Sequence, residues 1–220
     1  TMSHNIKPGV ATGDQVQEIF NYAKENNVIL ALMASKTTFA VSAGAVSQLA
    51  VLAIDAFGTG DGGSGLLLAA RGVGSSVGPF LLMRFVHGNM PRLLFLCGLA
   101  GLVWSGLYLF AAASPSLWIA AALIGIAHLG GGAQWMMSNY GLQTVTPDYI
   151  RGRVLAGDMG FATLVMGISS VVAGVLGEIF PIRIAIALIA VICGLASTAY
   201  LFGTIGMRKR LRSEMLPQSA

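Results

Sequence analysis

The sequence predicts an all-α membrane protein with six transmembrane helices, and three observations carry that prediction. Of the 220 residues, 55% are hydrophobic and only 10% are charged, whereas soluble domains carry about 25% charged residues. The mean hydropathy is +0.75. Six apolar runs alternate with short polar breaks, and a run of about 20 such residues is long enough to cross the hydrocarbon core of a bilayer. A water-soluble core would not alternate so regularly.

The predicted elements follow one another along the chain in a simple order. Residues 1–27 form a polar lead, in which Val16, Ile19, Phe20 and Ala23 recur at helical spacing. This spacing is typical of a short amphipathic helix, lying on the membrane surface or acting as a soluble connector. The six spans are expected at about 28–55, 64–86, 93–113, 117–138, 154–177 and 184–206. Residues 207–220 form a basic tail.

The lysines and arginines predict the orientation of the spans. Of the 13 Lys and Arg residues, only Arg183 falls on the side opposite the termini, and Lys36 and Arg71 fall within spans. The others lie on the side of the two termini: Lys7, Lys24, Arg84, Arg92, Arg151, Arg153, Arg208, Lys209, Arg210 and Arg212. The positive-inside rule then places both termini in the cytoplasm of a multi-pass protein of the plasma (inner) membrane.

Motifs of other functional classes are absent or out of context. GTGDGG matches GxGxxG at Gly58, Gly60 and Gly63, but it lacks the βαβ setting of a dinucleotide site and reads as a flexible turn. The sequence has no phosphate-binding loop, no HExxH motif and no basic stripe with interleaved aromatic residues, so neither a metal, a cofactor nor nucleic acid is expected. Cys97 and Cys193 lie in different apolar runs and are interpreted as packed or lipid-facing thiols.

No enzyme is expected either. Ser169 and His128 are the residues that an intramembrane hydrolase would use, but no further group in the sequence is placed to orient them.

Polar side chains inside or at the ends of the spans carry the candidate chemistry, because an intramembrane ionisable residue is by default a functional-site hypothesis. These residues, the candidates for a substrate pathway or for coupling, are Lys36, Arg71, His128, Gln134, Asn139 and Asp158. Lys36 and Asp158 lie at similar depths from the same side, so an ion pair between them is geometrically open. Arg71 either extends its head to the outer interface or faces a hydrated cavity and meets an anionic group.

The other polar residues also allow two interpretations each. His128 lies close to the midplane, where it either bonds a neighbouring helix or accepts a proton. Gln134 and Asn139 lie on the cytoplasmic half of the same span. They either join helices through hydrogen bonds or contact a substrate.

Small residues concentrate in the second and fifth spans, where they let helices approach closely. The residues selected for helix packing are Gly72, Gly74, Gly78, Pro79, Gly157 and Gly160. Because the second span of each three-helix half is unusually rich in glycine, the sequence predicts a weak internal repeat. Such a repeat fits the two inverted three-helix units of a transporter half.

Two stretches carry a resemblance to a known family. LLLAARGVGSSVGPFL resembles the eighth helix of major facilitator superfamily transporters of the bacterial efflux branch, both enterobactin-exporter-like and macrolide-efflux-like. TVTPDYIRGRVLAGDMGF (144–161) resembles that branch's loop between helices ten and eleven, with the core Pro147, Arg151, Gly152, Arg153 and Val154. MRFVHGNMPR departs from the pattern, because it lacks the aspartate that the loop after helix eight often carries. The gating contacts usually assigned to that loop are therefore not carried over.

The resemblance implies that the chain is the C-terminal six-helix half of a twelve-helix transporter. We then expect a secondary active transporter, a proton-coupled antiporter that exports small molecules by alternating access. Its partners would be the substrate, the proton, the lipid bilayer and an N-terminal six-helix half, in the same chain or a second copy. Pro147, Arg151, Gly152 and Arg153 would form a cytoplasmic gate loop. The alternative is a non-transporting six-helix scaffold or partner subunit.

Overall fold

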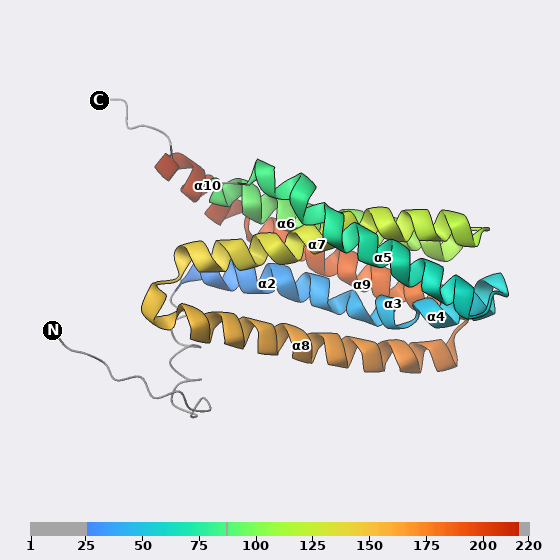
Figure 1. Cartoon of the computed structure of the whole chain (residues 1–220). Helices are drawn as coiled ribbons and strands as arrows, with labels where there is room; N and C mark the ends of the chain where they lie inside the picture. The colour runs from blue at the N-terminus through green and yellow to red at the C-terminus, as the bar shows by residue number, and fades with distance from the viewer. Residues whose placement is uncertain (1–25, 87, 216–220) are drawn as a thin grey trace.

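The computed structural model describes residues 26–86 and 88–215, and in this part of the chain every regular element is a helix. Six stretches are long and apolar enough to cross a membrane: Asn27–Ala56, Asp61–Phe85, Met90–Ala113, Leu117–Val145, Asp148–Ile179 and Ile182–Gly203. They lie side by side as an elongated bundle (Figure 1). The predicted all-helical class with six apolar spans is therefore confirmed. The amphipathic helix expected around residues 16–23 lies outside the described residues.

The first span consists of several short elements, and each of the others is essentially one helix. The first is built from α2 (Asn27–Val41), α3 (Ala43–Ser47), α4 (Leu49–Val51) and the short π-helix η1 (Leu52–Ala56). The second is α5 (Asp61–Leu82), which ends in the 3₁₀ turn η2 (Met83–Phe85). The remaining spans are α6 (Met90–Ala113), α7 (Leu117–Val145), α8 (Asp148–Ile179) and α9 (Ile182–Gly203), followed by α10 (Ile205–Met215).

Local sequence explains where several helices begin. The Asn26 side chain accepts a hydrogen bond from the Val28 amide at 3.1 Å, and the Asn89 side chain accepts one from the Arg92 amide at 2.9 Å. Asparagine is among the preferred N-cap residues because its side chain satisfies an otherwise unpaired backbone N–H. Pro147 and Pro181 directly precede α8 and α9, where the fixed φ of proline suits a helix start.

Hydroxyl residues of the first span form local hydrogen bonds next to its break. Thr38 donates a hydrogen bond to the Ser35 carbonyl at 2.7 Å, and Ser42 donates one to the Phe39 carbonyl at 2.5 Å. Such bonds from a side chain to its own helix compete with the regular backbone ladder. The regular helix ends at Val41 and resumes at Ala43.

Glycines allow the close packing of α5 on α7. A Cβ atom on Gly74 would lie 2.1 Å from the Gly125 carbonyl oxygen, and one on Gly78 would lie 2.0 Å from the Leu129 carbonyl oxygen. Only residues without a side chain allow this separation. By contrast, a Cβ on Gly72 or Gly160 would meet no atom within 4 Å, so these two glycines pack against no other helix in the described chain.

The helices α5 and α8 are the least buried of the six spans. In their most apolar stretches, 17% of the residues of α5 and 11% of those of α8 are buried, against 39–50% in the other spans. The helix α5 packs on α7, and α8 packs on α2 and α3. In Figure 1, α8 lies along one edge of the bundle. Two of the six spans therefore leave broad apolar faces uncovered by the described chain.

The connection between the fourth and fifth spans is shorter than expected. Residues 146–153 do not form a loop, because α7 continues to Val145 and α8 begins at Asp148. The tail is helical as far as Met215, because α10 follows α9 with only Thr204 between them. Pro147 explains the short connection, since a proline ends one helix and suits the start of the next.

Candidate functional site

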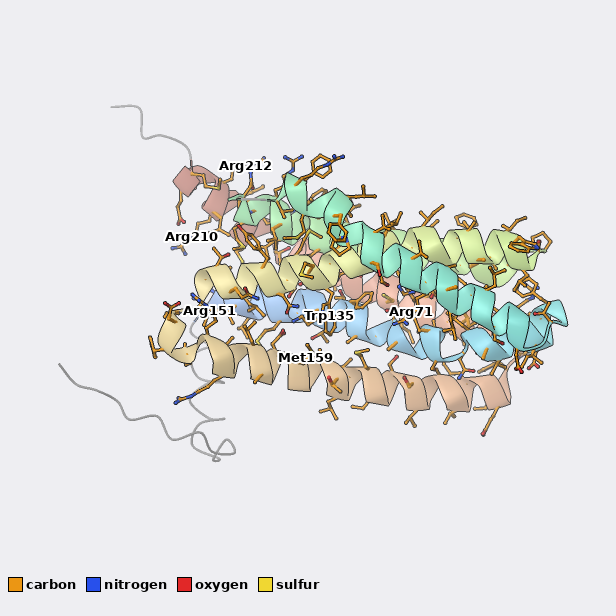
Figure 2. All side chains as sticks on the ribbon, viewed as in Figure 1. Arg71, Trp135, Arg151, Met159, Arg210 and Arg212 are labelled. Atoms are coloured by element: carbon orange, nitrogen blue, oxygen red, sulfur yellow. The ribbon has the colours of Figure 1, made fainter. Side chains whose placement is uncertain are left out.

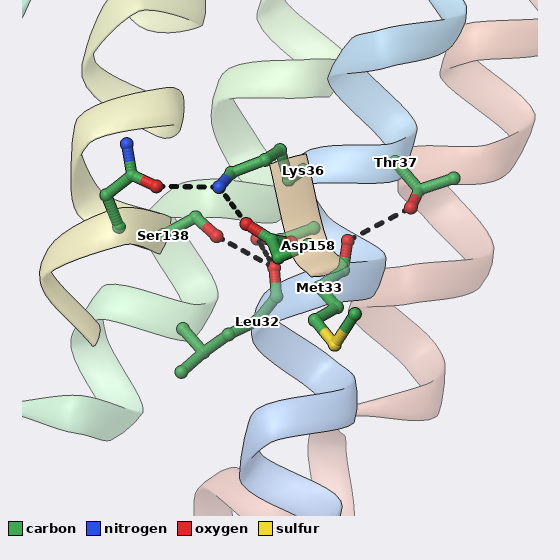
Figure 3. A network of polar contacts seen from close by, with 8 residues as sticks. Leu32, Met33, Lys36, Thr37, Ser138 and Asp158 are labelled. Atoms are coloured by element: carbon green, nitrogen blue, oxygen red, sulfur yellow. Dashed lines mark hydrogen bonds and ion pairs between the residues drawn. The ribbon is translucent and has the colours of Figure 1, made fainter. Parts of the chain in front are cut away.

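A buried ion pair joins the first and fifth spans. The Nζ atom of Lys36, on α2, donates to Oδ2 of Asp158, on α8. The same Nζ donates to Oδ1 of Asn139, on α7, at 2.6 Å, so three helices meet at one ammonium group (Figure 3). Beside this centre, the Ser138 hydroxyl of α7 donates to the Leu32 carbonyl of α2 at 2.9 Å.

Because the Lys36–Asp158 pair is buried, the loss of either charge is expected to reduce the stability of the protein. The side chain of Lys36 is 1% exposed and that of Asp158 is 2% exposed. A further partner of the ammonium is the ring of Trp135, whose centroid lies 4.9 Å from Nζ, a distance at which a cation is attracted to the face of an aromatic ring. Removing one member of a buried pair leaves an uncompensated charge, and such a change costs about 3–5 kcal/mol.

A second polar contact holds α8 to the first span, at the break between α2 and α3. The Ser169 hydroxyl donates to the Val41 carbonyl at 2.5 Å and accepts from the Gly44 amide at 3.2 Å. Ser169 therefore satisfies two backbone groups that the interrupted helix leaves free. This is a structural role, and it differs from the hydrolytic role considered for Ser169.

Asp158 and Ser169 lie on one face of α8. They are 11 residues apart, about three helical turns, and Ile150, Val154 and Ala162 continue the same buried stripe. The helical spacing of Asp158 and Ser169 is visible in the sequence. The role of Ser169 could not be predicted from it, because that role depends on the break in the first span.

Gln134 and His128 both bond neighbouring helices. The amide nitrogen of Gln134 donates to the Ser35 carbonyl at 2.6 Å and to the Thr38 hydroxyl at 3.0 Å. His128 Nε2 lies 2.9 Å from the Tyr108 hydroxyl, and Nδ1 lies 3.5 Å from the Ser75 hydroxyl. Tyr108 is a partner that the sequence did not single out.

Arg71 lies in the middle of α5, half-buried and away from the ion pair. Its Nε atom is buried and has no hydrogen-bond partner in the described chain. Among the described residues, no carboxylate forms an ion pair with it. Of the six polar candidates, the structure thus brings Lys36, Asn139 and Asp158 together, and it places Gln134, His128 and Arg71 elsewhere.

The residues expected to form a gate lie at the end of the bundle. Pro147 precedes α8, and Arg151, Gly152 and Arg153 lie in its first turns. Arg151 forms an ion pair of 2.5 Å with Asp148 and donates to the Thr146 carbonyl at 3.1 Å. Arg151 shares this end of the bundle with Arg210 and Arg212 (Figure 2).

Arg183 makes contacts of a different kind, at the connections between spans. It donates to the carbonyls of Ala112 and Ser114 at 2.6 and 2.7 Å and to that of Ala56 at 3.2 Å. These bonds tie the ends of the first and third spans to the start of α9.

The described residues contain no group of three or more His, Cys, Asp or Glu side chains that could hold a metal ion. The chain matches no protein-family model, no curated protein and no solved structure.

Proposed function

We propose that the chain is the C-terminal half of a secondary active transporter, a proton-coupled exporter of small molecules that works by alternating access. The observation that carries the proposal is the Lys36–Asp158 ion pair, which is buried among apolar spans and joins α2 to α8. Ionisable residues inside a membrane are costly, and in pumps and transporters they serve as proton relays and line substrate paths.

The pair offers a simple coupling step. A proton that reaches Asp158 neutralises the carboxylate, and the ion pair with Lys36 is lost. The ammonium then retains Asn139 and the ring of Trp135 as partners. The helix α8 retains the Ser169 contact but loses its charged contact, so protonation changes how firmly α8 is held to α2. Release of the proton on the other side of the membrane restores the pair.

The pattern of helix contacts supports two inverted three-helix repeats. Exchanging spans one to three with spans four to six turns the packing of α5 on α7 into the packing of α8 on α2 and α3. The same exchange turns the contact of α6 with α7 into that of α9 with α2 and α3. The two least buried spans, α5 and α8, also exchange with each other. Repeats of this kind are a common construction of transporter halves.

The uncovered faces of α5 and α8 fit a second six-helix half, with the substrate path between the two halves. We place the protein in the plasma (inner) membrane with both termini in the cytoplasm, because the basic residues gather at that end. The major facilitator resemblance is part of this proposal.

Proton flux in proteoliposomes tests the function. The full-length protein is reconstituted with an internal pH dye, and ethidium or 2-naphthoate is added as a cationic or anionic test substrate. We expect compound-dependent proton movement with the wild type, its loss in Asp158→Asn, and normal flux in Glu214→Gln, whose carboxylate is exposed and lies in α10. Absence of proton movement with both compounds would contradict the proposal and favour a scaffold.

A further inference from the structure

Arg71 is a cation in the middle of α5, and the Lys36–Asp158 ion pair does not involve it. Arg71 is ten residues from the start of α5 at Asp61, which corresponds to about 15 Å along the helix. An extended arginine side chain is shorter than that distance, so its head stays within the span. A guanidinium has five N–H donors and no acceptor.

No described residue compensates this charge. No hydrogen bond or ion pair joins Arg71 to the described chain, and its Nε atom is buried without an acceptor. Asp158, the carboxylate of the buried ion pair, is bonded to Lys36. Charged side chains inside a membrane normally pair with one another or with backbone carbonyls. An unpaired guanidinium at this depth therefore requires an anionic partner, and this partner must come from outside the described chain.

Polar and aromatic side chains lie about one helical turn along α5 from Arg71. Three residues along α5 from Arg71, a Cβ on Gly74 would lie 3.1 Å from the Cβ of His128, whose Nε2 lies 2.9 Å from the Tyr108 hydroxyl. One turn along α5, Ser75 faces His128. These groups offer hydrogen bonds next to the charge.

An aromatic strip continues from His128 toward the ion pair. The ring of Phe39 lies 6.4 Å from that of His128 and 6.0 Å from that of Trp135, edge to face in both cases. Phe39 and Trp135 are only partly buried. In Figure 2, Arg71 and Trp135 both lie in the middle part of the bundle. The strip thus provides aromatic surface between the His128 ring and the Lys36–Asp158 pair.

We infer that Arg71 is the recognition residue for the anionic group of an amphipathic organic substrate, and that Phe39 and Trp135 contact its apolar or aromatic body. A carboxylate, sulfonate or phosphate ester fits the guanidinium, because planar N–H pairs bind such groups in a bidentate manner. This inference rests on the proposed transport function and names the class of substrate.

Binding of a matched pair of probes tests the inference. The purified protein in phosphatidylcholine nanodiscs is titrated calorimetrically with 2-naphthoate and with its uncharged amide, 2-naphthamide, and empty nanodiscs give the lipid background. We expect the wild type to bind 2-naphthoate at least about tenfold more tightly, the scale of a charge-assisted hydrogen bond. Arg71→Gln abolishes the preference and Arg71→Lys retains part of it. Arg84→Gln, a change in the turn η2, leaves it unchanged.

Equal affinities of the wild type for the two probes, or a preference that survives Arg71→Gln, would overturn the inference and leave Arg71 as an anchor to lipid phosphates. The preference is measured without flux, so its failure is distinguishable from failure of the transport function. A protein that binds 2-naphthoate selectively but moves no protons would support the anion site and contradict the proposed transport function. A protein that moves protons but shows no preference for 2-naphthoate would support the proposed transport function and contradict the anion site.

Discussion

Individual side chains decide where polar chemistry is possible in this apolar bundle. Lys36 and Asp158 meet because they project from neighbouring spans at the same level. Their similar depth from one side could be read from the sequence, since each helical residue adds about 1.5 Å. The third partner, Asn139, and the ring of Trp135 could not be assigned in this way, because they depend on how α7 is rotated against α2.

The strength of the pair is tested by a double-mutant cycle. We expect Asp158→Asn and Lys36→Met each to destabilise the protein by about 3–5 kcal/mol, because each leaves one buried charge uncompensated. The combined Lys36→Met/Asp158→Asn variant should cost clearly less than the sum of the two. Thermal unfolding in nanodiscs measures these changes. Glu214→Gln, which removes an exposed ion pair with Arg210, should have little effect. Strict additivity of the two buried substitutions would contradict a direct pair.

At the scale of the elements, the break in the first span and the contact of α5 with α7 shape the bundle. The positions and order of the six spans follow from apolar runs of sufficient length. The break in the first span cannot be predicted from the sequence in this way, because hydroxyl residues like those beside it also occur in regular helices. It depends on Ser169 of another span, and sequence periodicity carries no information on such a long-range bond.

Ser169→Ala tests that contact. The substitution leaves the Val41 carbonyl and the Gly44 amide without their partner, and an unsatisfied buried group costs about 1–3 kcal/mol. Ser170→Ala is the matched control, because the Ser170 hydroxyl bonds only the Met166 carbonyl of its own helix. Thermal unfolding of the two variants should separate them, and equal midpoints would show that the Ser169 contact contributes nothing.

Glycine substitutions test the packing of α5 on α7. Gly78→Ala would place a Cβ 2.0 Å from the Leu129 carbonyl oxygen, so the two helices must move apart. We expect a clear loss of thermal stability. Gly72→Ala meets nothing within 4 Å and should be neutral or stabilising by up to about 1 kcal/mol, since alanine favours helix. A neutral Gly78→Ala would mean that the two helices do not pack this closely.

At the scale of the whole molecule, the distribution of charge defines two ends. Arg151, Arg210 and Arg212 lie at one end, while Arg183 bonds connections between spans at the other. The sequence alone predicted this separation, because the spans alternate in direction and the basic residues fall into alternate connections.

Cysteine labelling tests the orientation. Gly60→Cys lies in the exposed connection between the first two spans, and Ser213→Cys lies in exposed α10. A membrane-impermeant maleimide should label Gly60→Cys in intact cells and Ser213→Cys only after permeabilisation. The native Cys97 and Cys193 are buried and should stay unlabelled. The reverse pattern would invert the proposed topology.

We propose that the Lys36–Asp158 pair holds α8 against α2 and that loss of the carboxylate charge releases it. The most direct measurement is the spin-label distance between Ala34→Cys on α2 and Ala156→Cys on α8, both exposed positions, by double electron–electron resonance. We expect a single distance with Asp158 intact and an additional population at longer distance in Asp158→Asn. Identical distance distributions in the two proteins would contradict it.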